Sequence, residues 1–373
     1  MKNRVKNDIA FLLIGAMIFV LAGCGEAHHT KEQSSERKEG IQVMDCVGRE
    51  VTLEKEAEKI VDLTMIDGVR TLVQLGAQDR VVGISNQGSR IFNTEGMVKK
   101  NYVIVSQAAP ELKDLAVVGD SKEPNVEMII SLKPDVILVD SMAKNVAEHI
   151  QKQTNTPVVC VGSFGSFHYD MFRMLGKIVG KEERAEELVT FTKNKMKLVT
   201  DITAGIGADE RKRLFYWTHP FAGNAPKTNG NYEAFQLAGG KNVASEGEVI
   251  PEGVYEITKE QILAWDPAFI FLHSPFKEDF EGWLTVDSVK EDEVIQGTEA
   301  FVKGNVYPIK GELSGWDMAT EAAEVFYVAK ILYPERFQHL DVEKEGNEIL
   351  KKFYGIEGLY TDMSKQIKLY QWQ

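Results

Sequence analysis

The sequence predicts an α/β protein with two similar αβ lobes joined by a long helix. The first observation is an internal repeat, because residues 125–141 (NVEMIISLKPDVILVDS) correspond to residues 258–274 (TKEQILAWDPAFIFLHS). Each copy reads as a short helix, a proline break and a buried strand, and Glu127 aligns with Glu260. The alternative is that two unrelated αβ units merely look alike. Repeated αβ units favour two Rossmann-like lobes with parallel sheets, whose ligands bind at the carboxyl ends of the strands.

The second observation is a long helical pattern in the middle of the chain. Residues 182–203 carry apolar side chains at helical spacing, and a helix of that length spans about 33 Å. Such a rod can bridge two lobes and should bend less than a linker made of strands. We therefore expect an N-terminal lobe over 41–166, linking helices over 167–205 and a C-terminal lobe over 206–373.

The remaining elements follow from apolar runs that Gly and Pro interrupt. We expect the N-terminal lobe to begin with a hairpin over 43–53 that turns at Gly48. Further strands are predicted at 60–64, 81–84, 136–140, 158–161, 213–217 and 305–309, and further helices at 169–180, 319–332 and 341–353. We expect the last helix to dock on the C-terminal lobe.

The N-terminus reads as an export signal. Lys2, Arg4 and Lys6 precede an apolar run over 9–20, which is too short for a comfortable membrane span. The following LAGC resembles the bacterial lipobox, and this resemblance implies a signal peptide over 1–23 and a lipid on Cys24. The alternative is an ordinary secretory signal with an incidental cysteine. We expect residues 24–40 to form a polar, flexible stalk and the lipid to hold the protein on the extracytoplasmic face of the membrane.

Composition narrows the range of functions. The formal net charge of −13 becomes −15 without residues 1–23, which carry +2, and such a balance disfavours nucleic acid as a partner. The chain shows no zinc-type cysteine or histidine spacing. Cys46 and Cys160 are the thiols left after Cys24. They can pair outside the cell, but no sequence feature brings them together, and we expect buried free cysteines.

Several segments together carry a family likeness: DCVGREVTL with IVDLT, the repeated unit, NYEAFQLAGGKNVA, and WDMATEAAEVFYVAKILYPERF. Over residues 41–337 the chain resembles the helix-linked (class III) substrate-binding lipoproteins of ABC importers for iron–siderophores, haem and corrinoids. The resemblance implies a monomeric, non-enzymatic receptor that captures a metal chelate and holds no cofactor of its own. It also implies an ABC permease with ATPase subunits as the partner.

The same resemblance implies a role for the two aligned glutamates. In that family one glutamate on each lobe contacts the permease, and Glu127 and Glu260 match those positions. Charge complementarity of this kind chiefly sets encounter rate and register. A local role is the alternative, because each glutamate follows a candidate helix cap, Asn125 or Thr258, where a negative charge favours the helix dipole.

Candidate ligand contacts lie in the loops that follow the strands. The Tyr216 loop mixes aromatic and small polar groups, which suits a flat or bulky ligand, although large rings also fill cores. His219 and His273 are the candidate metal ligands, with a satisfied loop histidine as the alternative for each. Arg70 is a cationic candidate that can instead cap a surface. The predicted contacts are Met65, Asn86, Ser141, Tyr216, Trp217, His219, Tyr232, His273 and Trp316.

Three other functions stay open at this point. A receptor of the same architecture can bind molybdate or tungstate through backbone N–H groups, but that ligand leaves the aromatic loop unexplained. An extracellular metal-dependent enzyme is another class, and against it the chain has no G-x-S-x-G, H-E-x-x-H or P-loop motif. A surface adhesin or sensor on this fold is the third.

Overall fold

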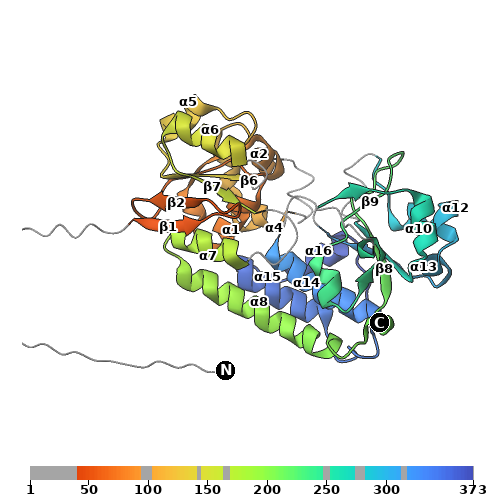
Figure 1. Ribbon diagram of the computed structural model, residues 1–373. Helices are drawn as coiled ribbons and strands as arrows, with labels where there is room; N and C mark the ends of the chain where they lie inside the picture. The colour runs from red at the N-terminus through yellow and green to blue at the C-terminus, as the bar shows by residue number, and fades with distance from the viewer. Residues whose placement is uncertain are drawn as a thin grey trace, which may run out of the picture. The chain divides into compact units, whose positions relative to one another are not determined.

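The computed structural model describes residues 40–93, 103–140, 144–162, 169–246, 253–273, 282–311 and 317–372. Residues 40–373 form one compact unit. Within the described residues, two parallel sheets flanked by helices make the two lobes (Figure 1). The predicted signal peptide, Cys24 and most of the predicted stalk lie outside the described residues.

The two sheets share one topology. The N-terminal sheet has the order β5-β4-β3-β6-β7, and the C-terminal sheet has the order β10-β8-β12-β13, with parallel pairing throughout. Four strands of one sheet therefore correspond in order to the four strands of the other. Their bounds are β3 Ile60–Asp62, β4 Val81–Ile84, β5 Ala116–Val117, β6 Val136–Asp140, β7 Val158–Val161, β8 Arg213–Trp217, β10 Lys241–Asn242, β12 Phe269–His273 and β13 Val306–Ile309.

The internal repeat is confirmed in detail. Helix α5 (Val126–Leu132) precedes β6, and α10 (Lys259–Trp265) precedes β12. Each helix begins at a side-chain cap, since Asn125 accepts from Met128 N and Thr258 accepts from Gln261 N. Each ends at a left-handed residue, Lys133 (φ 51°) or Asp266 (φ 45°). The two copies thus occupy equivalent places in the two lobes.

Short antiparallel pairs supplement the sheets. The predicted hairpin forms from β1 (Ile41–Met44) and β2 (Glu50–Leu53), and Gly48 in its turn has φ +76°. A second pair joins β9 (Lys227–Thr228) to β11 (Tyr255–Glu256). The other α-helices are α1 Asp67–Leu75, α2 Asn86–Asn93, α4 Ile104–Ala108, α6 Lys144–Thr154, α7 Tyr169–Ile178, α9 Glu233–Leu237, α11 Val286–Lys290, α12 Glu293–Gln296, α13 Glu299–Val302 and α16 Leu359–Gln366.

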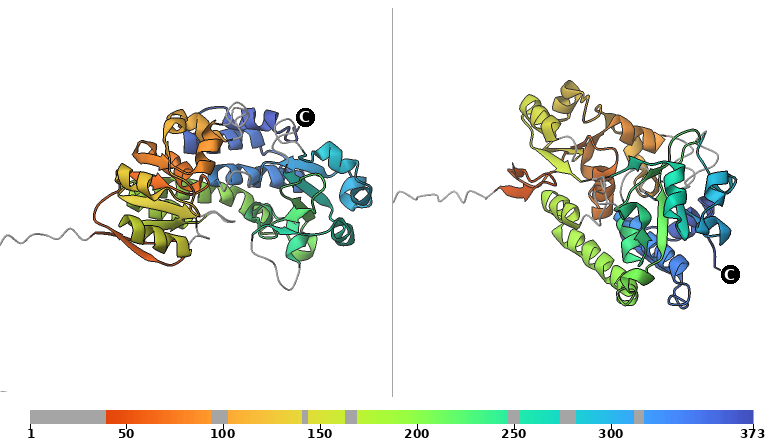
Figure 2. Two further views of the ribbon diagram at one scale, coloured as in Figure 1. Left: turned by 90° about the horizontal axis from the view of Figure 1, so that it is seen from above. Right: turned by 45° about the vertical axis from the view of Figure 1, so that its right-hand side comes forward.

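The long helix is α8, Glu182–Thr203, as the sequence predicts. It leads from the N-terminal lobe to the C-terminal lobe and runs beside α14 (Met318–Leu332) (Figures 1 and 2). Lys195 of α8 forms ion pairs with two glutamates of α15 (Val342–Tyr354), at 2.7 Å to Glu345 and 2.9 Å to Glu348. These ion pairs fix the linking helix α8 to the C-terminal helix α15.

The hydrophobic core explains why the central strands are apolar on both faces. In β6, Val136 and Leu138 face a central cluster, whereas Ile137 and Val139 face an outer cluster. The C-terminal sheet alternates in the same way, with Tyr216 in the central cluster and Phe215 in a second outer cluster. The central cluster contains residues of both lobes, of α8 and of α14. One shared core therefore connects the two sheets.

The C-terminal tail departs from the prediction. Helix α15 packs on α14, as expected for docking on the C-terminal lobe, but it also contacts α1 and α4 of the N-terminal lobe. Its buried residues Ile349, Leu350 and Phe353 belong to the central cluster that both lobes share. The amphipathic pattern of the tail predicts a buried face but does not specify what that face contacts.

The cysteine prediction is half correct. Cys160 is buried in β7, but Cys46 is exposed in the hairpin turn, and both are free. The turn lies on the surface, so the residue type alone was a poor guide to burial. In the part of the chain that the structure describes, no helix is both long enough and apolar enough to span a bilayer.

Candidate functional site

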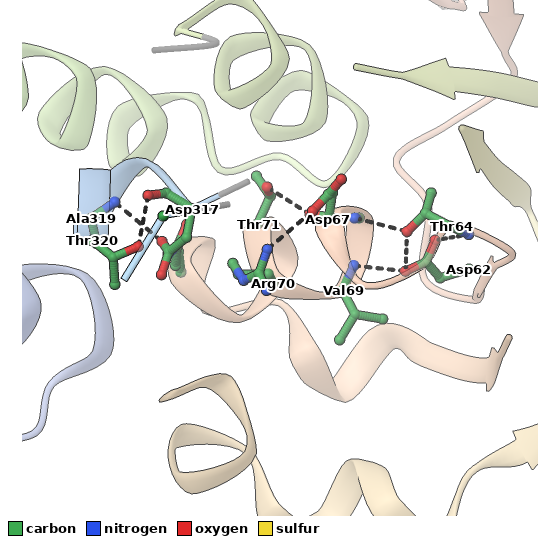
Figure 3. Close-up of polar contacts among 12 residues, drawn as sticks. Asp62, Thr64, Asp67, Val69, Arg70, Thr71, Asp317, Ala319 and Thr320 are labelled. Carbon is green, nitrogen blue, oxygen red and sulfur yellow. Dashed lines mark hydrogen bonds and ion pairs between the residues drawn. The ribbon is translucent and has the colours of Figure 1, made fainter. Parts of the chain in front are cut away.

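A buried carboxylate organises the loop that follows β3. Asp62 is fully buried and accepts hydrogen bonds from Thr64 N (3.0 Å), Thr64 Oγ1 (3.0 Å) and Val69 N (2.8 Å) (Figure 3). Its burial raises the pKa of Asp62 to about 6. Gly68 is required here, because a Cβ at that position would lie 2.7 Å from Asp62 Oδ1. Met65, a predicted contact, is half-buried in this loop.

Helix α1 begins with a buried ion pair. Arg70 Nη1 lies 3.0 Å from Asp67 Oδ1, and the two side chains are 6 % and 1 % exposed (Figure 3). Moving two charges out of water costs desolvation free energy, and their mutual attraction repays this cost only if hydrogen bonds also satisfy the remaining polar atoms. A buried ion pair is therefore weak evidence for a purely stabilising role. Arg70 thus lies inside the molecule beside a partner rather than at a surface.

A hydrogen-bonded triangle joins the two lobes beside this pair. Gln74 Nε2 of α1 donates to Asp317 Oδ1 (2.8 Å) and to the Tyr354 hydroxyl (2.8 Å). The Tyr354 hydroxyl donates to Asp317 Oδ2 at 2.9 Å. Asp317 also caps α14, since its carboxylate accepts from Ala319 N at 3.1 Å. The N-terminal lobe is therefore fixed to the start of α14 and the end of α15.

Three adjacent strands of the C-terminal lobe end at polar residues. Strand β8 is followed by Thr218 and His219, β12 ends at His273, and β13 is followed by Lys310. Because parallel strands end at one edge of a sheet, these side chains gather there. The His219 and His273 ring centroids are 5.7 Å apart, and Thr218 Oγ1 lies 2.8 Å from His219 Nδ1 and 3.4 Å from His273 Nδ1.

The surroundings of both histidines favour the neutral imidazole. Burial lowers the pKa of His219, and burial together with His219 lowers the pKa of His273 well below the ordinary value. His273 is fully buried, and Trp283 Nε1 donates to its backbone oxygen at 3.0 Å. His219 is half-buried and has φ +47°, a conformation that is uncommon for residues other than Gly but is adopted more often by Asn, Asp and His than by most side chains.

His219 is the histidine that reaches a cavity. A surface pocket of about 400 Å³ is lined by His219, Lys227, Val254, Tyr255 and Glu256. Nδ1 of His219 is hydrogen-bonded to the Thr218 hydroxyl. If Nδ1 carries the proton, Nε2 is a metal ligand or acceptor, and if Thr218 donates to Nδ1, Nε2–H is a donor. One neutral imidazole therefore suits either a metal centre or an oxygen-rich anion.

The end of β13 packs on buried tyrosines. Glu324 accepts from Gly311 N (2.8 Å) and from the Tyr232 hydroxyl. Gly311 has φ +65°, and a Cβ there would lie 2.3 Å from the Tyr216 hydroxyl. Burial lowers the pKa of Lys310 and raises that of Glu324. This corner of the site is closely packed.

The predicted contacts are distributed unevenly. Tyr216, Trp217 and Tyr232 are 0 %, 1 % and 3 % exposed and belong to the hydrophobic clusters. Asn86 is exposed, and its Nδ2 donates to Asp120 Oδ2 at 2.9 Å. Ser141 and Trp316 lie outside the described residues. The role of each of these residues as a ligand contact stays a prediction.

Sequence reasoning missed several residues of this site. Asp62 had a usable signal, because it is a carboxylate inside the apolar run IVDLT with Gly68 following. Gln74, Thr218 and Trp283 had none, since their partners are distant in sequence or their types are common in cores. Among the described residues, no group of three or more His, Cys, Asp or Glu side chains is arranged to hold a metal ion.

Residues 66–313 match the family model described as "Periplasmic binding protein". The chain belongs to this family. It is therefore a non-enzymatic, extracytoplasmic substrate-binding protein of an ABC transporter, and its cognate transporter is the expected partner. The two-lobed fold with a long linking helix, predicted from the sequence, is confirmed.

Two curated relatives and one solved structure illustrate the range of this periplasmic binding protein family. The molybdate-binding protein MolA of Haemophilus influenzae is 27 % identical, over 92 % of this chain and 95 % of its own. The Fe(3+)-citrate-binding protein YfmC of Bacillus subtilis is 24 % identical, over 82 % of this chain and 89 % of its own. The solved structure of MolA bound to molybdate has a TM-score of 0.67 and 23 % identity, covering 85 % of this chain and 98 % of that chain.

The two aligned glutamates of this periplasmic binding protein are both exposed. Glu127 lies in the first turn of α5, and Glu260 lies in the first turn of α10. One helical turn further, Ile130 is 49 % exposed and Leu263 is 41 % exposed. Each lobe thus presents a carboxylate and an aliphatic side chain at equivalent positions of the repeat.

Proposed function

We propose that this ABC-transporter receptor captures a metal-containing solute at the carboxyl ends of its strands. The observation that supports this proposal is His219, a neutral imidazole at the end of β8 that lines a cavity and has a left-handed backbone. Strained backbone at a non-glycine residue recurs at ligand sites, because the surroundings must hold it there. The ligand contacts the Nε2 side of the ring, since Thr218 holds Nδ1.

The first ligand class is a molybdate-type oxyanion. The family resemblance favours a chelate, and the sequence argument against an oxyanion is that it leaves the aromatic loop unexplained. The burial of Tyr216, Trp217 and Tyr232 in the core accounts for these rings without a flat ligand. MolA, a relative over most of the chain, carries the name of a molybdate-binding protein. In this case His219 donates from Nε2–H to an oxygen of the anion.

The second ligand class is the chelated metal that the sequence predicted, such as an iron–siderophore, haem or a corrinoid. A neutral imidazole at His219 is also a suitable axial or bridging ligand for the metal of a chelate. The relative named for Fe(3+)-citrate binding supports this class. In this case Nδ1 of His219 carries the proton and donates to Thr218 Oγ1.

The loaded receptor docks on its permease through both lobes. Glu127 and Glu260 supply one carboxylate on each lobe, and Ile130 and Leu263 supply an apolar contact one turn away. A permease that binds both lobes in this way needs a cationic group opposite each carboxylate and an apolar group opposite each aliphatic side chain. It therefore has two equivalent halves. Lipidation at Cys24 keeps the receptor near that partner, and two Bacillus subtilis relatives are named as lipoproteins.

Calorimetric titration with His219→Asn tests the site. Asparagine tolerates the left-handed conformation, so the variant removes the imidazole and keeps the backbone. We expect the wild-type protein to bind one of molybdate, tungstate, ferric citrate, a ferric siderophore, haem or cobinamide. His219→Asn should weaken that binding at least tenfold, which is about 1.4 kcal/mol.

The matched control is His149→Asn, which changes an exposed histidine on α6. It should leave the affinity unchanged. Equal affinity of wild type and His219→Asn for the bound solute would refute the assignment of His219. Binding of none of the six solutes would refute both ligand classes.

A further inference from the structure

The turn of the β1–β2 hairpin pairs with the edge strand β7. Cys46 N donates to Cys160 O at 3.2 Å, and Asp45 Oδ2 accepts from Cys160 N at 3.2 Å. Both polar groups of the Cys160 backbone are therefore satisfied by two consecutive residues of the turn. The chain separation is 114 residues, so only the fold brings these two cysteines together.

The Cys46 thiol lies against the backbone of Cys160. The Cys46 thiol donates to Cys160 O at 3.0 Å. The single backbone bond from Cys46 N to Cys160 O places the two main chains side by side, and a disulfide joins residues whose Cα atoms are about 4.4–6.8 Å apart. A disulfide here requires a change of side-chain rotamer that turns the Cys46 sulfur from the Cys160 backbone oxygen toward the Cys160 sulfur.

Access to the two thiols is unequal. Cys46 is exposed, whereas Cys160 is fully buried in β7. Arg49 Nη1 lies 3.6 Å from Cys160 Sγ, and this guanidinium partly offsets the rise in the Cys160 pKa that burial causes. A reagent in solvent meets Cys46 first. The neighbouring Cys160 is then the thiol that attacks a mixed disulfide formed on Cys46.

We propose that Cys46 and Cys160 form an intramolecular disulfide by exchange with a small-molecule disulfide outside the cytoplasm. In the first step the Cys46 thiolate attacks the small disulfide, forming a mixed disulfide and releasing one small thiolate. In the second step the Cys160 thiolate attacks Cys46 Sγ, closing the protein disulfide and releasing the second small thiolate. Two protein thiols are oxidised, and one small disulfide is reduced to two thiols.

Neighbouring charges set the speed of this exchange. Burial raises the pKa of Cys46 to about 12 and that of Cys160 to about 11. Asp45 disfavours both thiolates, Asp140 disfavours that of Cys46, and Arg49 favours that of Cys160. Because the thiolate is the nucleophile, the rate should rise about tenfold per pH unit between pH 7 and pH 9.

The disulfide would fasten the hairpin to the sheet edge. Closing a long loop restricts the unfolded chain, which favours the folded state. The oxidised protein should therefore unfold at a higher urea concentration than the reduced protein, independently of which solute the receptor binds.

The test is oxidation of the full chain carrying Cys24→Ser, which leaves Cys46 and Cys160 as its thiols. The reduced protein is incubated with oxidised glutathione at pH 7, 8 and 9, then alkylated and analysed by intact mass and peptide mapping. We expect a product two hydrogen atoms lighter, with the Cys46 and Cys160 peptides joined. Cys160→Ala should instead accumulate one glutathionyl group on Cys46, and Cys46→Ala should leave Cys160 unmodified.

Two outcomes would overturn the proposal. One is a stable glutathionyl adduct at Cys46 of the parent protein without closure. The other concerns the reaction with oxidised glutathione at pH 9. If Cys46 of Cys160→Ala is completely glutathionylated while the parent protein, after the same time, still has both thiols free, the proposal is wrong. An unchanged urea midpoint after closure would overturn the stabilising role of the disulfide.

Discussion

The hydroxyl of Tyr354 takes part in the hydrogen-bonded triangle between the lobes. It accepts from Gln74 Nε2 at 2.8 Å and donates to Asp317 Oδ2 at 2.9 Å. Burial and the Asp317 carboxylate raise the pKa of Tyr354 well above its usual range, so the hydroxyl keeps its proton and remains a donor. Tyr354→Phe removes this group and retains the ring that packs in the shared core.

The magnitude follows from the two lost contacts. A hydrogen bond to a charged group contributes about 1.5–3 kcal/mol, and one between neutral groups contributes about 0.5–1.5 kcal/mol. Gln74 keeps its direct bond to Asp317 at 2.8 Å, which limits the loss. We therefore expect Tyr354→Phe to lower the free energy of unfolding by about 2–3 kcal/mol.

Urea unfolding followed by tryptophan fluorescence measures this change. Tyr370→Phe is the matched control, because Tyr370 is 45 % exposed, and a surface substitution should stay within about 0.5 kcal/mol. A loss below about 0.5 kcal/mol for Tyr354→Phe would refute the role given to the Gln74–Asp317–Tyr354 triangle.

Three further predictions concern a pH dependence, a backbone turn and the docking surface. Because the folded pKa of Asp62 is raised from 3.8 to about 6, its stabilising contribution is fully present below about pH 4 and is lost as the pH rises through 6. The loss is about 3 kcal/mol by urea unfolding, and Asp62→Asn should remove this part of the pH profile; an unchanged profile in the variant would contradict the assignment. Gly119→Ala should destabilise by at least about 1 kcal/mol more than Gly48→Ala, because both have positive φ but only Gly119 would place a Cβ 2.3 Å from a backbone oxygen, that of Glu123. Equal urea midpoints for the two variants would show that the clash is relieved. Ile130→Asn with Leu263→Asn should reduce stimulation of the transporter ATPase at least tenfold without changing ligand affinity, whereas Leu198→Asn, at a residue 54 % exposed on α8, should do neither; a matching loss in Leu198→Asn would remove the docking assignment.

Much of the fold could be predicted because its signals are local. The bounds of β6, β7, β8 and α8 match their predicted ranges at both ends, since each is an apolar run or a helical pattern with clear breakers. The repeat predicted the correspondence between β6 and β12, which the strand orders confirm.

Other elements lacked such signals. Strands β5, β10 and β11 have two residues each, so no alternation could identify them. The contacts of α15 with both lobes depend on partners such as Gln74, which is 280 residues away from Tyr354. Sequence pattern specifies which face of a helix is buried but not which distant element covers it.

The candidate site shows the same limit. Residue type predicts Tyr216 and Trp217 as ligand contacts, which stays a prediction, but it does not show that alternation along β8 places them in the central and the outer cluster. The sequence predicts His219 and His273 as two separate candidate ligands. Burial lowers the pKa of each, and His219 lowers that of His273 further, and only the fold supplies that burial and nearness. The nearness of Cys46 and Cys160 had no sequence signal at all.

Uptake by cells is the most direct test of the central claim that this receptor serves a metal-solute importer. Cells lacking the chain would be supplied with molybdate, ferric citrate, a ferric siderophore, haem or cobinamide at limiting concentration, and cell-associated molybdenum, iron and cobalt would be measured over minutes. We predict that uptake of one of these metals falls and that the wild-type chain restores it, whereas a chain carrying Glu127→Arg and Glu260→Arg does not. Unchanged uptake of all three metals in cells lacking the chain would contradict the account.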